Sequence, residues 1–128
     1  MKKQAQVIDE SLLQQCLAGG GSVALARVAR LEPIYPGTRG AKVIIHLEIE
    51  QQLHGKLPGQ VNYWVYGGLE QVKMPPRLMI AVYPPYEGTD EVEMIASVAV
   101  PEGSEAESVQ AHQQVLAKLG KSSAPTGR

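Results

Sequence analysis

The sequence contains no phenylalanine and only one tryptophan, Trp64, so Val, Ile, Leu and Tyr must supply the bulk of any core. Cysteine is almost as scarce. The single Cys16 excludes an intrachain disulfide and a metal site built from several thiolates. No run of about 18 apolar residues occurs, which excludes a membrane-spanning helix of the usual length.

The first residues, MKKQAQ, are basic, but no apolar stretch follows them as it would in an export signal. The chain as written therefore predicts a cytoplasmic protein. If an export segment precedes Met1 in the native gene product, the expected location becomes extracytoplasmic.

Lysine and arginine are also missing from residues 78 to 117, although the net charge of the whole chain is only −1. The same stretch carries the acidic residues Glu87, Asp90, Glu91, Glu93, Glu102, Glu105 and Glu107. An acidic half of a domain repels a phosphate backbone wherever it borders the binding site. The charge distribution thus disfavours nucleic-acid binding without excluding it.

The 128 residues fit one domain, and 44% hydrophobic content is typical of a globular chain. We expect residues 1–120 to form this domain and residues 121–128 to form a disordered tail. Asp9 or Ser11 can cap a helix over 10–18, which Gly19 to Gly21 would end. A second helix is expected from a capping box of Ser104 and Glu107 to a stop at Gly120.

Five segments between these helices read as strands: 22–32, 41–51, 60–68, 78–83 and 91–100. The second has the clearest period of two, with Val43, Ile45, Leu47 and Ile49 on one face. In the first, Val23, Leu25, Ala29 and Leu31 are expected to share a side, but Arg27 interrupts the row, a pattern that leaves room for a bulge. In the fifth, Met94, Ala96, Val98 and Val100 are expected to share a side. The connections are too short for crossover helices, which favours an antiparallel sheet. The predicted fold class is mainly β: a five-stranded antiparallel OB-like barrel with a short N-terminal helix and a C-terminal helix.

The order of these segments resembles a known family. DESLLQQCLAGG leads into SVALARVARLE, and KVIIHLEIEQQLHGKLPGQV is followed by NYWVYGG and PRLMIAVY. Over roughly residues 10 to 85 this resembles secreted bacterial domains of the tissue-inhibitor-of-metalloproteinase and netrin-module type. The resemblance implies an OB-type barrel that binds or inhibits rather than catalyses. Inhibitors of that group use an N-terminal cysteine; Cys16 lies inside a predicted helix, so their mechanism is not carried over.

Few residues suggest chemistry. His46 and Glu48 share a strand face at a spacing that offers two ligands to one ion, but no third ligand is identifiable and a solvated strand face explains the pair equally well. His112 falls on the apolar face of the second helix, where a partly buried histidine is expected, and His54 lies in a turn. Cys16 reads as a small buried hydrophobe. The sequence therefore predicts a protein that is not an enzyme and has no cofactor or metal.

The aromatic residues form a better candidate site. Tyr63 alternates with Trp64 and Tyr66, so one set faces the core and the other faces out. The predicted binding surface consists of Trp64, Tyr66, Tyr83 and Tyr86, unless the C-terminal helix covers them. The expected function is a non-enzymatic protein-interaction module. The alternative is single-stranded nucleic-acid binding, with bases stacked on the aromatic rings and Arg27, Arg30, Lys42 and Lys56 neutralising phosphates.

Overall fold

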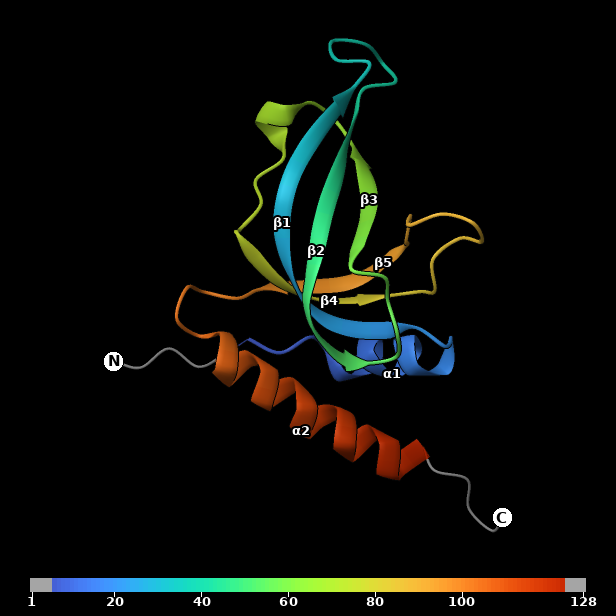
Figure 1. Ribbon diagram of the computed structural model, residues 1–128, viewed down its shortest axis with the longest axis vertical. Helices are drawn as coiled ribbons and strands as arrows, with labels where there is room; N and C mark the ends of the chain where they lie inside the picture. The colour runs from blue at the N-terminus through green and yellow to red at the C-terminus, as the bar shows by residue number, and fades with distance from the viewer. Residues whose placement is uncertain (1–5, 124–128) are drawn as a thin grey trace.

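The protein is mainly β, with a helix before and after the strands, as the sequence predicted (Figure 1). The structure, a computed structural model, describes residues 6–123. Its elements are α1 (Glu10–Ala18), β1 (Ser22–Ile34), β2 (Lys42–His54), β3 (Gln60–Tyr66), the short 3-10 helix η1 (Leu69–Gln71), β4 (Arg77–Val82), β5 (Met94–Ala99) and α2 (Glu105–Ser123).

The strands form one antiparallel sheet in the order β3-β2-β1-β4-β5. The sheet is strongly curved, and β4 and β5 run across the direction of β2 and β3 (Figure 1). The outer strands β3 and β5 do not pair along their length, so the sheet is open. One parallel bridge joins Asn62 of β3 to Glu91, just before β5. There, the Asn62 N–H donates to the Asp90 carbonyl (2.9 Å) and the Val92 N–H donates to the Asn62 carbonyl (2.8 Å).

The β2–β3 hairpin confirms the predicted period of two. Lys42 pairs with Tyr66 and Glu48 with Gln60, and the register has no bulge between them. Every second side chain of β2, from Val43 to Leu47, is buried, while its neighbours are only half-buried. An unbroken pleat keeps one row of side chains facing inward over the whole length of the pair.

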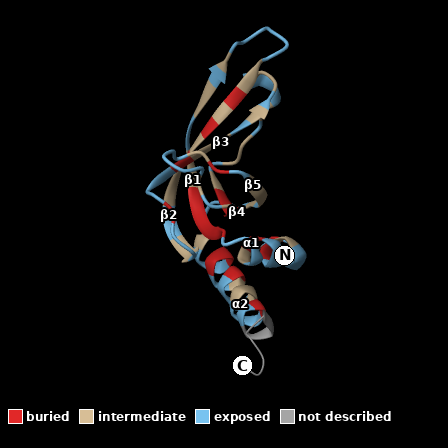
Figure 2. Ribbon diagram, turned by 90° about the vertical axis from the view of Figure 1, so that its right-hand side faces the viewer, coloured by how far each residue is buried: buried red, intermediate tan, exposed pale blue. Residues whose placement is uncertain are grey.

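The apolar residues form two clusters, one on each side of the sheet. The inner cluster lies within the curve of the sheet and contains Ala24, Ala26, Val43, Ile45, Leu47, Leu57, Val61, Leu78, Ile80, Val82 and Val92. The helix-side cluster lies on the opposite side of the sheet, where the two helices pack. It contains Ile8, Leu13, Cys16, Val23, Leu25, Met79, Ala81, Val100, Val109 and Leu119. Figure 2 shows the buried residues concentrated where β1 and β4 approach the helices, while the far end of the sheet is largely exposed or half-buried.

The predicted common side of β1 is wrong beyond Leu25. Val23 and Leu25 join the helix-side cluster, whereas Leu31 packs against the inner cluster and Ala29 is exposed. The reason is an irregularity in the pairing with β2 between Val28 and Arg30. A bulge adds one residue to a strand, so it sends the following side chains to the opposite face.

The predicted common side of β5 is also wrong, because its pairing with β4 contains a bulge. The strand begins at Met94 instead of residue 91, and its pairing with β4 shifts between Ala81 and Val82. Met94 therefore packs against the inner cluster, while Val98 and Val100 belong to the helix-side cluster.

Local signals at the start and end of α1 act as expected. The Asp9 carboxylate caps the helix by accepting the Ser11 N–H (2.8 Å), and Gly20 follows the helix with φ +72°, which glycine adopts without steric cost. At the start of α2, the Glu105 carboxylate accepts the Gly103 N–H (3.3 Å), a contact outside the predicted capping box.

The predicted helix stop at Gly120 is wrong, because α2 continues to Ser123. The predicted disordered tail therefore begins inside a helix, and residues 124–128 lie outside the described part of the chain. One glycine costs a helix only about 1 kcal/mol, and the side chains of Val109, His112 and Leu119 anchor α2 on the helix-side cluster.

Candidate aromatic site

Trp64 and Tyr66 lie on the outer face of β3, as the alternation predicted. Trp64 is 36% exposed and Tyr66 is 74% exposed. Tyr63 and Val65, which alternate with them, pack against the inner cluster. The helix α2 does not cover this face, because the helix-side cluster on which α2 packs contains no residue of β3. The expectation of an exposed pair of rings is therefore met by the geometry of β3.

The Trp64 side chain is held in place by three polar and aromatic contacts. Its ring meets the Tyr66 ring edge-to-face, with the ring centroids 4.8 Å apart. The ammonium nitrogen of Lys42 lies 4.5 Å from the centroid of the Trp64 ring, and the indole N–H donates to Glu91 Oε2 (3.3 Å). These contacts fix the orientation of the ring, which lowers the entropy lost when a partner binds it.

A groove of about 490 Å³ opens beside Trp64, between β3 and the segment that leads into β5. Its β3 side consists of Tyr63, Trp64 and Val65, and its opposite side includes Tyr86, Glu91 and Met94. We call it the edge groove. Tyr86 is 50% exposed. Trp64 and Tyr86 thus line one concave site, and Tyr66 extends it along β3.

Tyr83, the fourth residue of the predicted surface, lies elsewhere. Its hydroxyl accepts a hydrogen bond from the Gln15 side chain (2.6 Å), and its ring lies against Gly19, at the end of α1. Tyr83 therefore packs on the helix, and the structure brings together only Trp64, Tyr66 and Tyr86. We call these three residues the aromatic surface.

The edge groove has an acidic border. Glu91 and Glu93 line it, and Glu87 and Asp90 are exposed in the same β4–β5 connection. Since residues 78 to 117 contain no Lys or Arg, this connection supplies no cation to balance them. Among the basic residues, Lys42 is engaged with Trp64, and Arg39 lines a separate hollow together with Tyr66. The groove thus presents aromatic carbon together with negative charge.

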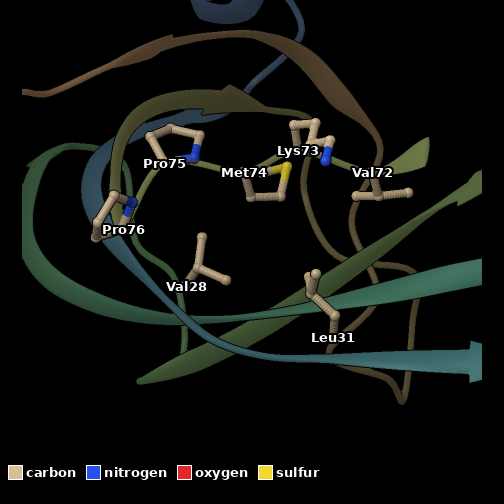
Figure 3. A pocket seen from close by; sticks show the side chains of 7 residues that line it. All are labelled: Val28, Leu31, Val72, Lys73, Met74, Pro75 and Pro76. Atoms are coloured by element: carbon tan, nitrogen blue, oxygen red, sulfur yellow. The ribbon is translucent and has the colours of Figure 1, made fainter. Parts of the chain in front are cut away.

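A second hollow, of about 600 Å³, was not predicted from the sequence. It forms where residues 72–76 pass alongside β1, and Val28, Leu31, Val72 and Met74 point into it from the two sides (Figure 3). The Val28 N–H donates to the Pro76 carbonyl (2.8 Å), which closes one end. All four side chains also pack against the inner cluster. The hollow offers an apolar surface, with Lys73 as its only ionisable lining residue.

The residues considered for metal binding or acid–base chemistry do not assemble. His46 Nε2 lies 2.8 Å from Glu32 Oε1, whereas Glu48 pairs with Arg27. The two predicted ligands therefore take different partners. His54 is exposed at the end of β2. Over the described residues, no three His, Cys, Asp or Glu side chains group closely enough to hold a metal ion.

Cys16 and His112 are buried structural residues. The Cys16 thiol contacts the carbonyl oxygens of Ser22 (3.4 Å) and Val82 (3.6 Å), and burial raises the pKa of the thiol. In His112, Nε2 accepts the Ile8 N–H (3.1 Å) and Nδ1 donates to the Ser108 carbonyl (2.8 Å). Burial lowers the pKa of the imidazole, so the ring is neutral. Neither side chain reaches a groove where it could act on a substrate.

The cations proposed to bind phosphates are dispersed or already paired. Arg27 forms ion pairs with Glu48 and, at 4.0 Å, with Glu50. Arg30 forms an ion pair with Glu32, at 3.6 Å. Lys56 is exposed in the β2–β3 connection, away from the groove lining. These residues do not form a continuous basic path beside the aromatic rings.

Neither helix in the described part of the chain is long and apolar enough to cross a membrane. No protein-family model and no curated protein matches the sequence.

Proposed function

We propose that the protein is a non-enzymatic interaction module that binds another protein through Trp64, Tyr66 and Tyr86. The observation that carries this proposal is the position of Trp64, which is exposed, held by its neighbours and placed at the wall of a groove. Buried aromatic anchors contribute much of the binding energy at protein interfaces, and Trp and Tyr are enriched among them. A pre-oriented ring beside a hollow is suited to that role.

The charge of the site supports a protein partner over a nucleic acid. Glu91 and Glu93 lie at the groove, and acidic groups repel a phosphate backbone. The arginines expected to offset this repulsion, Arg27 and Arg30, face carboxylates of their own sheet. Of the four basic residues expected to neutralise phosphates, the one that the structure shows beside the aromatic rings is Lys42, whose ammonium lies over Trp64.

We also propose that the sheet closes into a small OB-like barrel. The order β3-β2-β1-β4-β5 places β3 and β5 at the two edges of the curved sheet, and the parallel bridge at Asn62 and Glu91 lies where such a barrel would close. This arrangement agrees with the resemblance to the inhibitor and netrin-module domains. Binding without catalysis is what that resemblance implies.

The proposed function can be tested by selecting binders from a phage-displayed library of random dodecapeptides. We expect peptides that bind the wild-type protein and lose at least about tenfold in affinity for the Trp64→Ala/Tyr86→Ala variant, since each anchor is worth 1 kcal/mol or more. Tyr35→Ala is the matched control, because Tyr35 is 69% exposed but does not line the edge groove.

Two results would contradict the proposal. One is a selection whose peptides bind the double variant as tightly as the wild type. The other is tight, salt-dependent binding of a labelled single-stranded oligonucleotide, which would favour the nucleic-acid alternative instead.

A further inference from the structure

The backbone of β3 has a free edge at the aromatic surface. On the side facing β2, the Gly67 N–H donates to the Ala41 carbonyl (2.9 Å) and the Ile49 N–H donates to the Gly59 carbonyl (2.8 Å). Odd-numbered residues of this strand therefore direct their N–H and C=O groups to β2. Because these groups alternate in direction along a strand, the even-numbered residues direct theirs to the opposite edge. Asn62 does so in its bridge to residues 90–92.

The pairing on that opposite edge stops after Asn62. Beyond Val92 the chain turns away to join β4, where the Tyr83 N–H donates to the Glu93 carbonyl (3.1 Å) and Val82 pairs with Met94. Within residues 6–123, no hydrogen bond is made to the backbone N–H or C=O groups of Trp64 and Tyr66. An unpaired strand edge of this kind is a template for another strand.

The edge groove lies along this free edge and has side chains on both faces. On the inner face, Tyr63, Val65 and Met94 provide apolar contacts. On the outer face, Trp64 and the acidic groups Glu91 and Glu93 border the groove. An extended peptide directs successive side chains to opposite faces, with a rise of about 3.3 Å per residue. Such a peptide would place one row of its side chains against the apolar residues of the inner face and the other row against Glu91 and Glu93.

We propose that Trp64 and Tyr66 bind an extended segment of a partner protein as an added β-strand. The inference rests on the proposed function and specifies the class of partner. Backbone hydrogen bonds to Trp64 and Tyr66 provide the pairing. Apolar side chains of the segment face Tyr63 and Val65, and alternating Lys or Arg side chains face Glu91 and Glu93.

Charge argues against a second copy of this chain as the occupant. A two-fold dimer formed edge to edge through β3 would bring the same residues of both copies together. Glu91 and Glu93 would then approach their own equivalents, and like charges across an interface oppose association. A basic segment from a different protein meets the complementary charge.

The test uses a fluorescein-labelled acetyl-(Val-Lys)3-amide peptide and fluorescence anisotropy at low salt. Two further peptides carry N-methyl groups on the lysine nitrogens only or on the valine nitrogens only. In an added strand, one set of N–H groups faces β3 and the other faces solvent. We therefore expect one N-methylated peptide, and not the other, to lose at least about tenfold in affinity, as expected for lost backbone hydrogen bonds.

The methylated peptide that loses affinity also reports the direction of the strand. Trp64 and Tyr66 carry outward side chains, so an antiparallel partner would use the backbone of its outward lysines, and a parallel partner that of its inward valines. Equal affinities for the two methylated peptides would overturn the proposal. If acetyl-(Val-Glu)3-amide bound as tightly as the lysine peptide, the proposal that the partner segment is basic would be overturned.

Two substitutions at one position test the protein side. Tyr66→Ala and Tyr66→Pro both remove the ring, but only proline removes the N–H at the free edge. That N–H does not bond to β2, so we expect both variants to keep the far-ultraviolet circular dichroism of the wild type. Peptide affinity should be at least about fivefold weaker for Tyr66→Pro than for Tyr66→Ala. If the proline variant fails to fold, the comparison of methylated peptides on the wild-type protein decides the matter.

The remaining outcomes separate this inference from the proposed function. Selected peptides that need Trp64 and Tyr86 but bind equally well after N-methylation of either set would support the interaction module and overturn strand addition. Peptides that bind the Trp64→Ala/Tyr86→Ala variant as tightly as the wild type would overturn both strand addition and the proposed interaction module. A dimer of the protein alone by sedimentation, dissociated by Tyr66→Pro, would identify a second copy as the occupant and overturn the basic partner segment.

Discussion

Replacing His112 with phenylalanine should make the protein less stable at neutral pH and less sensitive to acid. The imidazole is fully buried, and its Nε2 accepts the N–H of Ile8 from the chain before α1. Phenylalanine keeps a ring in the space but leaves this buried N–H without a partner, which costs about 1–3 kcal/mol. We expect the free energy of unfolding at pH 7.5 to fall by that amount.

The pH dependence follows from the direction of the pKa shift. Burial lowers the pKa of His112 in the folded protein below the ordinary value of 6.5, so the unfolded chain binds the proton more readily. The neutral ring therefore stabilises the fold fully above pH 6.5, and this contribution decreases as the pH falls from 6.5 to the folded pKa. The loss is at most about 1.4 kcal/mol per pH unit. The phenylalanine variant has no such loss.

Urea unfolding followed by far-ultraviolet circular dichroism at pH 7.5, 6.5 and 5.5 measures the effect. Other titrating groups are common to both proteins, so their contributions cancel in the difference between the wild type and His112→Phe. We expect this difference to narrow below pH 6.5. A difference that stays constant across the three pH values would show that His112 titrates alike in both states, and would refute the assignment of a buried neutral ring.

Three further predictions concern backbone and thiol. Gly55→Ala should destabilise the protein by more than about 1 kcal/mol in urea unfolding, because φ is +74° and a Cβ would lie 2.4 Å from the Ser22 hydroxyl. Gly59→Ala, with nothing within 4 Å, is its control and should be nearly neutral. Gly120→Ala should stabilise the protein by up to about 1 kcal/mol, since the glycine lies in α2 with open space around it; an unchanged or lower unfolding midpoint would contradict the continued helix. Cys16 should react with a thiol reagent at pH 8 only as fast as the protein unfolds, because the thiol is buried with a raised pKa, and rapid modification of the native protein would count against this burial.

The sequence was most informative where strand pairing is regular. Val43, Ile45 and Leu47 could be assigned to the core because period two continues without interruption between β2 and β3. Leu31 and Met94 could not, because Leu31 follows a bulge in β1 and Met94 precedes one in β5. A bulge depends on how a strand fits its partners, which are distant in the sequence. In β1 the alternation broken at Arg27 indicates a bulge but not its place between Val28 and Arg30, and in β5 the alternation gives no sign of one.

The site shows the same division. Alternation within β3 alone assigns Trp64 and Tyr66 to the outer face. The position of Tyr83 on a segment expected to neighbour β3 predicts that it joins them, but Tyr83 follows β4 and packs at the end of α1. The hollow between Val28, Leu31 and Met74 depends on the path of residues 72–76 across β1, which local composition does not specify.

The first residues of β1 have a consequence for how the molecule unfolds. Val23 and Leu25 belong to one apolar cluster and Ala24 and Ala26 to the other, so a single short stretch of backbone serves both. If this stretch loses its order on one side of the sheet, the cluster on the other side loses its packing as well. The two halves should therefore melt in one cooperative transition, and amide hydrogens of residues 22–26 should exchange only through global opening.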